Sequence, residues 1–193
     1  MTTSTISEPL LTKTLSKYVL PGPRYEHSLR VATQARLLAK HWNLDSSIAY
    51  SAGILHDIAK QITPDTIKTK SLPIDSLDAL FQSYPKIWHS FFGPYLAKYE
   101  LPDISPKILN AMRWHSTGKS KMTALEKVIF ISDFIEPGRT VEEAARARYL
   151  AFESLDLCVY YISNYSILSL IERKLVIHPY TLKCRNYYLN TKS

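Results

Sequence analysis

The segment AGILHDIAK, residues 52–60, joins a run of apolar and small side chains to a histidine and an aspartate. Because His56 and Asp57 follow this run directly, both polar groups lie close to an element that must be buried. An imidazole and a carboxylate entering a core need partners, since an unpaired ionised group there is strongly destabilising. A metal ion satisfies both groups, so this stretch indicates a metal site inside a helical core.

Apolar residues recur at intervals of three and four positions along most of the chain, and strict alternation is scarce. This spacing is typical of amphipathic helices and predicts an all-α protein. Residues 61–85 contain Pro64, Pro73 and Pro85 and are predicted only as short helical pieces. Elsewhere we expect helices over residues 9–20, 25–41, 46–60, 86–99, 105–115, 123–136, 153–174 and 180–190, and one more that starts at Thr140.

The predicted helix starts carry recognisable capping residues. A polar N-cap precedes the apolar pattern at four positions: Asp45, Ser105, Thr123 and Thr140. A glutamate follows three residues after each of the last two, which is the spacing of a capping box. Pro94 lies within the 86–99 pattern and is expected to end or kink that helix.

The composition is that of a globular domain. Hydrophobic residues make up 46% and charged residues 21% of the 193 positions, which excludes collagen-like, low-complexity and disordered classes. We predict a single domain over residues 1–193, in which residues 1–22 form an N-terminal helix. Residues 151–193 are expected to form C-terminal helices that pack on the metal-binding core.

The sequence also favours a cytoplasmic protein without a membrane partner. The apolar runs fall well below the roughly 20 residues that a bilayer span requires. The first twenty residues lack the features of a secretory signal. Two cysteines, Cys158 and Cys184, make no disulfide framework, and a reducing cytosol is the simplest location for them.

The formal net charge of +7 favours anionic partners such as phosphates. The basic residues are scattered along the chain instead of forming runs, so no nucleic-acid partner is expected. Charge alone does not separate a nucleotide enzyme from an RNA-binding protein.

Most of the histidines and two aspartates form a regular series along the chain. Each member is separated from the next by about one helix and one connection, so several helices of a bundle would each direct a polar group to one centre. Any one of these histidines on its own is equally well a hydrogen-bonded core residue. His41 ends a predicted helix and His178 precedes a proline, and we interpret both as structural. The series is His27, His56 with Asp57, His89, His115 and Asp133.

Four segments together resemble the bacterial YqeK family of HD-domain metal-dependent phosphohydrolases: RYEHSLRVA (24–32), GILHDIAK (53–60), HS (89–90) and WHSTGKSKMTALEKVIFISDFIEPGR (114–139). Of these, the stretch ISDFIEPGR (131–139) is the most specific, although Ser132 stands where the family commonly has alanine. The resemblance implies an HD-domain helical bundle around a dinuclear metal site. It also implies symmetrical hydrolysis of diadenosine tetraphosphate to two ADP, the activity of a symmetrical bis(5'-nucleosyl)-tetraphosphatase.

The family's ligand pattern matches this sequence at every position. The resemblance implies that His27, His56, Asp57 and Asp133 hold one metal ion, that His89 and His115 hold a second, and that Asp57 bridges the two. Such ligands suit iron, manganese, cobalt or zinc, and the resemblance favours two iron ions. A hydroxide shared by two metals is a nucleophile at neutral pH. Its attack on an inner phosphorus would expel ADP, and Asp57 and Lys60 are the expected catalytic residues.

The tetraphosphate of the substrate requires basic or backbone contacts in addition to the metals. Lys60 and Arg139 flank the metal ligands and are the main candidates, and Arg30 is a further one. Thr117, Gly118 and Lys119 follow His115 and are expected to offer backbone donors to phosphate oxygens. The late tyrosines are expected to pack helices or to form a homodimer contact more than to stack on adenine.

Two alternatives remain open from the sequence. The first is an HD-type phosphohydrolase that acts on another nucleotide, because one metal core fits many phosphate esters. The second is a non-enzymatic basic adaptor that binds nucleotides or RNA.

Overall fold

The computed structural model describes residues 6–62 and 83–190. The regular elements of this part of the chain are nine helices, which confirms the predicted all-α class. Most of the uncertain stretch 61–85 lies outside the described residues. The helices are α1 (Glu8–Ser16), α2 (Pro23–His41), α3 (Ser46–Leu55), α6 (Trp88–Glu100), α7 (Pro106–Trp114), α8 (Ala124–Ile135), α9 (Glu142–Glu153), α10 (Leu155–Glu172) and α11 (Pro179–Leu189).

Three of the four predicted N-caps are confirmed. The Asp45 carboxylate accepts hydrogen bonds from the backbone N–H groups of Ser47 and Ile48 at the start of α3. Ser105 caps α7 in the same way. Thr123 and Glu126 form the reciprocal capping box at the start of α8.

The predicted capping box at Thr140 is wrong. α9 begins at Glu142, and its N-cap residue is Val141, whose side chain makes no capping bond. The preceding turn is held by Arg148, which donates to the backbone carbonyls of Glu136 and Arg139. These bonds fix residues 136–139 as a loop, and the helix starts only after it.

Other helix limits also differ from the sequence pattern, and α1 ends at Ser16 instead of residue 20. α3 ends at Leu55 instead of residue 60, because the chain tightens there into turns with bonds from Ile58 N–H to Leu55 and from Lys60 N–H to Asp57. An extended Ser154 separates α9 from α10 and caps α10. α6 continues through Pro94 to Glu100, so that helix does not end at the proline.

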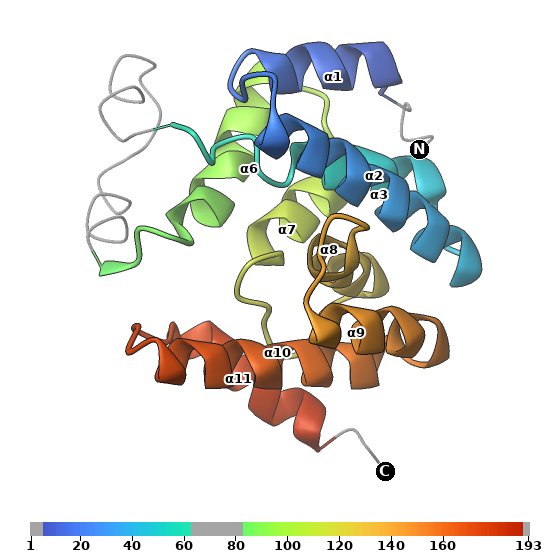
Figure 1. Ribbon diagram of the computed structural model, residues 1–193. Helices are drawn as coiled ribbons and strands as arrows, with labels where there is room; N and C mark the ends of the chain where they lie inside the picture. The colour runs from blue at the N-terminus through green and yellow to red at the C-terminus, as the bar shows by residue number, and fades with distance from the viewer. Residues whose placement is uncertain (1–5, 63–82, 191–193) are drawn as a thin grey trace.

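α8 is the central helix of the described structure. It packs against α2, α3 and α7 on one side and against α9 and α10 on the other. In Figure 1 the first helices lie at the top, α9–α11 at the bottom, and α7 and α8 between them. A central position suits α8 because it is apolar on most of its surface, with buried Val128, Ile129, Ile131 and Ile135.

A close contact between α2 and α3 fixes the two elements that precede the site. A Cβ atom on Gly53 would lie 2.7 Å from the Cα of Ala32, so a larger residue would push the helices apart. This contact lies five residues after His27 on one helix and three residues before His56 on the other. The glycine therefore sets the spacing between two of the candidate ligands.

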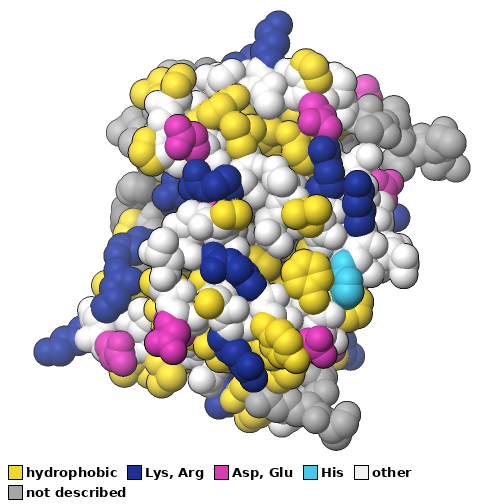
Figure 2. Space-filling model, turned by 45° about the vertical axis from the view of Figure 1, so that its right-hand side comes forward, with side chains coloured by type: hydrophobic (Ala, Val, Ile, Leu, Met, Phe, Trp, Pro, Cys, Tyr) yellow, Lys and Arg dark blue, Asp and Glu magenta, His cyan; other side chains and the backbone are white. Residues whose placement is uncertain are grey.

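The surface is basic without a single basic patch on the face seen in Figure 2, where Lys and Arg side chains are spread out and acidic side chains lie between them. This distribution agrees with the scattered basic residues of the sequence. No helix in the described part of the chain has both the length and the apolar character needed to cross a membrane.

Candidate metal centre

The structure brings all six predicted metal ligands together. They come from five helices or helix ends, so no two neighbouring elements alone could form the site. His27 lies in α2 and His89 in α6, whereas Asp133 lies in α8. His56 is the C-cap residue of α3, and Asp57 follows it. His115 is the C-cap residue of α7.

One group of ligands surrounds the Oδ2 atom of Asp57. The Nε2 atoms of His56 and His27 lie 3.6 Å and 4.0 Å from this oxygen. The Oδ1 atom of Asp133 lies 3.1 Å from Nε2 of His27 and 3.9 Å from Nε2 of His56. Two imidazoles and two carboxylates thus converge on one point.

A second group faces the other oxygen of the same carboxylate. Nε2 of His89 lies 3.0 Å and Nε2 of His115 lies 3.5 Å from Oδ1 of Asp57. The two imidazole nitrogens are 3.1 Å apart. Asp57 therefore stands between two ligand groups, one on each oxygen, which is the position that the family resemblance implied for a bridging ligand.

Backbone and side-chain acceptors fix the direction of three imidazoles. Nδ1 of His56 lies 2.6 Å from the carbonyl of Gly53, and Nδ1 of His115 lies 2.7 Å from that of Met112. Nδ1 of His27 lies 3.1 Å from a carboxylate oxygen of Glu136. Each acceptor requires a proton on Nδ1, so the lone pair of each Nε2 faces the centre.

The chemistry of this centre fits a bound metal. The Nε2 atoms of His27 and His56 are buried and lack a well-formed hydrogen bond within the described residues. They face carboxylate oxygens, so lone pairs and negative charge meet without a donor between them. A cation between these atoms would satisfy all of them at once. The same residues fall into three possible ligand triplets: His27, His56 and Asp57; His56, His115 and Asp133; and Asp57, His89 and His115.

The protonation states of His56, His89 and Asp57 also suit metal binding. Burial lowers the pKa of His56 to about 4 and that of His89 to about 4, so both imidazoles are neutral near pH 7. Burial on its own would raise the pKa of Asp57, but the positive charge that His56 carries below its own pKa, together with hydrogen bonds to His115 and His89, holds the pKa of Asp57 well below its usual range. Neutral imidazole and ionised carboxylate are the forms that bind metals.

Two residues that the sequence did not single out as partners of the ligands support them. Glu136 is buried and bonds His27, while its other oxygen accepts from Nε of Arg30 at 2.6 Å and from the N–H of Gly138. Nη1 of Arg24 lies 2.7 Å from Oδ2 of Asp57. Arg24 lies three residues before His27 on α2, so both side chains lie on the same face of the helix. This spacing is the sequence signal that could have identified Arg24 as a neighbour of the ligands.

Replacing Glu136 by glutamine will weaken metal binding about ten- to a hundredfold, because the ring of His27 loses its carboxylate acceptor. Titration of the protein against a competing chelator measures this affinity without depending on activity. Glu142→Gln, an exposed position at the start of α9, is the matched control and should leave the affinity unchanged. An affinity for Glu136→Gln within twofold of the original protein would contradict the positioning role of Glu136.

The predicted substrate-binding residues lie at different distances from the centre. Nζ of Lys60 is 3.2 Å from Nε2 of His89 and 4.0 Å from Oδ1 of Asp57, so it adjoins the second ligand group. Arg139 lies beside the first group, with Nη2 3.2 Å from Oδ1 of Asp133. Arg30 is engaged by Glu136, behind His27.

The segment after His115 is placed differently from these basic residues. Thr117 is buried and donates to the carbonyl of Gly118. Gly118 adopts a positive φ of 61° and faces Cys184, where an added Cβ would lie 2.5 Å from the sulfur. Nζ of Lys119 pairs with Glu126 at 3.1 Å. The structure thus joins these three residues to the protein core and to α8, and their contact with substrate stays a prediction.

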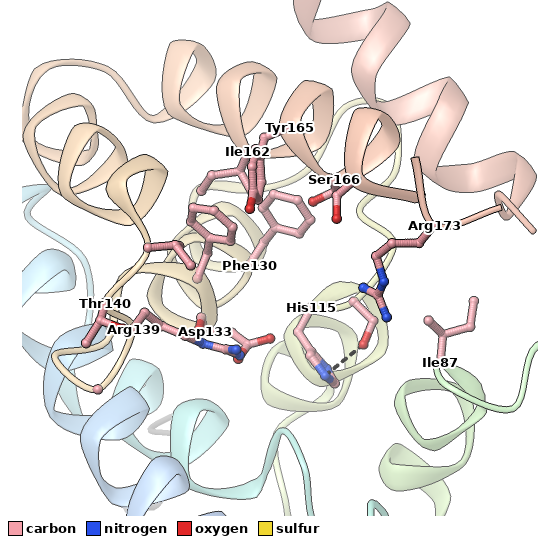
Figure 3. Close-up of a pocket in the computed structure, with 15 residues that line it drawn as sticks. Ile87, His115, Phe130, Asp133, Arg139, Thr140, Ile162, Tyr165, Ser166 and Arg173 are labelled. Carbon is pink, nitrogen blue, oxygen red and sulfur yellow. Dashed lines mark hydrogen bonds and ion pairs between the residues drawn. The ribbon is translucent and has the colours of Figure 1, made fainter. Parts of the chain in front are cut away.

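A cavity adjoins the metal centre and exposes ligands from both groups. Figure 3 shows Asp133 and His115 at one side of it, with residues of α10 on the opposite side. Ser116, beside His115, also lines this cavity. A molecule bound there would reach the centre directly.

This arrangement of ligands on a helical bundle defines the class of protein. Residues 24–138 match the HD domain family, and the chain belongs to that family. A crystal structure described as a predicted HD superfamily hydrolase involved in NAD metabolism, from Clostridium acetobutylicum, is 30% identical, with a TM-score of 0.85 over 98% of this chain and 100% of that one.

Two similar proteins point to a particular branch of the family. Both are named symmetrical bis(5'-nucleosyl)-tetraphosphatase. The protein from Staphylococcus aureus (strain NCTC 8325 / PS 47) is 35% identical over 91% of this chain and 92% of its own length. The protein from Bacillus subtilis (strain 168) is 31% identical over 90% and 94%. The chain belongs to this family of HD-domain hydrolases, which confirms the resemblance found in the sequence.

Proposed function

We propose that this protein is a metal-dependent hydrolase that cleaves diadenosine tetraphosphate, and related dinucleoside tetraphosphates, symmetrically to two nucleoside diphosphates. The observation that carries the proposal is the position of Asp57 between two ligand groups, one on each carboxylate oxygen. The names of the similar proteins supply the substrate.

The proposed metals are two transition-metal ions. His27, His56, Asp57 and Asp133 would hold one, and Asp57, His89 and His115 would hold the other. Mixed imidazole and carboxylate ligands without thiolate suit iron, manganese, cobalt and zinc, and we propose iron. When bound, such a pair supplies Lewis-acid activation of water and of phosphate oxygens.

The chain's own residues account for binding of a polyphosphate. Lys60 adjoins the second ligand group, and burial lowers the pKa of its ammonium group. A phosphate oxygen in contact with Lys60 would replace the hydration that this cation has lost. Arg139, beside Asp133, is exposed enough to turn its remaining N–H groups toward a second phosphate. Each of the two cations thus adjoins one of the two ligand groups.

Asp57 would act by holding both halves of the centre at a fixed separation. Its two oxygens are the contacts shared between the groups, and Arg24 fixes one of them. Symmetrical cleavage requires that water attack one of the two inner phosphorus atoms, so that one ADP leaves and the other ADP carries the oxygen of that water. The leaving ADP is a stable anion, so no strong acid is needed on the leaving oxygen. The protein is proposed to work in the cytoplasm, and a homodimer stays a prediction.

Product analysis tests the proposed function. Metal-loaded protein incubated with diadenosine tetraphosphate should release ADP as the sole nucleotide product, measured by ion-exchange chromatography. ATP, AMP and a cyclic dinucleotide serve as alternative substrates and should turn over far more slowly. Release of ATP together with AMP would contradict symmetrical cleavage, and faster turnover of another nucleotide would contradict the proposed substrate.

A further inference from the structure

The cavity beside the metal centre has the size and lining of a ligand site. Its volume is about 580 Å³, within the range of roughly 300 to 1,000 Å³ that is usual for small-molecule pockets. One side carries the metal-ligand residues His115 and Asp133. Elsewhere the lining includes two arginines, hydroxyl groups and aromatic rings, among them Arg139, Arg173, Ser166, Ser169, Phe134 and Tyr165.

Arg173 is a basic residue that lines this cavity and holds none of the metal ligands in place. It is the C-cap residue of α10, directly after Glu172, and Figure 3 shows its side chain extending from that helix end toward His115 and Ile87. Its guanidinium forms no hydrogen bond or ion pair that we find within residues 6–62 and 83–190. By contrast Arg139, the other cation lining the cavity, is bonded to Asp133.

A cation at the end of a helix also has a general explanation. The carbonyl groups at a helix C-terminus favour positive charge, which is a modest effect at an exposed position. That effect accounts for an arginine at residue 173 but requires no particular direction of its side chain. The direction observed, into a cavity that also exposes ligands of both metal groups, favours a bound anion as the partner.

The aromatic side of the cavity joins α8 to α10. The ring of Tyr165 meets that of Phe134 edge to face, with centroids 5.6 Å apart. Tyr165 is half-buried and lies two helical turns before Arg173 on α10. Ser166 and Ser169 lie between them and offer hydroxyl groups. Along α10, the cavity thus presents a ring, then hydroxyls, then a guanidinium.

We infer that this cavity takes one nucleoside diphosphate half of the substrate, with its phosphates bound by Arg173 and its nucleoside against Tyr165. The inference rests on the proposed function and adds α10 to the substrate-binding residues. A guanidinium presents paired N–H groups that match phosphate oxygens, and aromatic rings bind the faces of nucleobases. The order of groups along α10 then matches the order of diphosphate, ribose and base, with the phosphates nearest the metal ligands.

The first test compares Arg173→Gln with the original protein and with Arg146→Gln, an exposed arginine of α9 outside the cavity. Arg173→Gln should raise KM for diadenosine tetraphosphate about ten- to a hundredfold, as expected for loss of a charge-assisted contact. Its calorimetric affinity for ADP should fall by a similar factor. Metal content, Tm and hydrolysis of bis(p-nitrophenyl) phosphate should stay as in Arg146→Gln.

A second pair of variants separates the two parts of the cavity. Tyr165→Leu should weaken binding of ADP but not of inorganic pyrophosphate, whereas Arg173→Gln should weaken both. Tyr165→Phe keeps the ring and should retain the affinity for ADP. Each titration uses the metal-loaded protein.

Two results would overturn the inference. One is unchanged affinity of Arg173→Gln for ADP and pyrophosphate. The other is an equal loss against bis(p-nitrophenyl) phosphate with a lower Tm, which would make Arg173 structural. Failure of the proposed function is a separate result, namely that the original protein releases no ADP from diadenosine tetraphosphate.

Discussion

Replacing Asp57 by alanine will remove both turnover and bound metal. This carboxylate presents one oxygen to each group, with Oδ2 toward His56 and Oδ1 toward His89. Its loss therefore weakens two sites at once, whereas the loss of any imidazole weakens one directly. Because metal ions contribute several kcal/mol to stabilising a phosphoryl transition state, we expect turnover to fall by about a thousandfold or more.

Metal content and activity are both needed to interpret this variant. Elemental analysis of the purified protein should show a metal content near zero for Asp57→Ala, and circular dichroism should show that its helices remain. His41→Gln is a suitable control. This histidine is exposed, is not one of the six ligands, and bonds the backbone carbonyl of Phe152. Retention of both metals with full turnover in Asp57→Ala would remove the bridging role.

Removing the metals will lower the Tm of the protein by about 10 °C. The centre without metal brings two carboxylates against the Nε2 lone pairs of His27 and His56, and these nitrogens lack well-formed partners within the described residues. A metal that binds only the folded state at about a thousand times its Kd adds about 4 kcal/mol of stability. For a chain of this size, that corresponds to a shift of roughly 10 °C.

Scanning calorimetry with and without a chelator measures this shift. The Asp57→Ala variant provides the matched comparison, because its Tm should no longer depend on added metal. Equal Tm values for the metal-loaded and metal-free forms of the original protein would show that the cluster is stable by ordinary hydrogen bonds, contrary to our account.

The fold class was predictable from the sequence because it rests on local pattern, and the six ligands were predictable as a set because they match the ligand pattern of the family that the sequence resembles. The three- and four-residue spacing of apolar side chains identified the helices. His56 with Asp57 stood out because they follow a buried run, and Asp133 because it interrupts an apolar helix. Helix limits were less predictable. At Thr140 a local capping signal was overridden by Arg148, whose bonds to the preceding loop come from nine residues away.

The partners of the ligands were not predictable in the same way. Glu136 bonds His27 across 109 positions of the chain, so no short pattern connects them. The same bond network draws Arg30 toward Glu136, whereas the sequence suggested a phosphate contact from its proximity to His27. Arg173 caps the end of α10, a helix that contains no metal ligand. Only the packing of α10 against α8 brings Arg173 into the cavity beside the metal centre.

The most direct test of the central claim is anomalous diffraction from crystals of the protein grown with manganese. We expect two anomalous peaks, one among His27, His56, Asp57 and Asp133 and one among Asp57, His89 and His115, with Asp57 in contact with both. Absence of peaks at these residues, or strong peaks only elsewhere on the molecule, would contradict it.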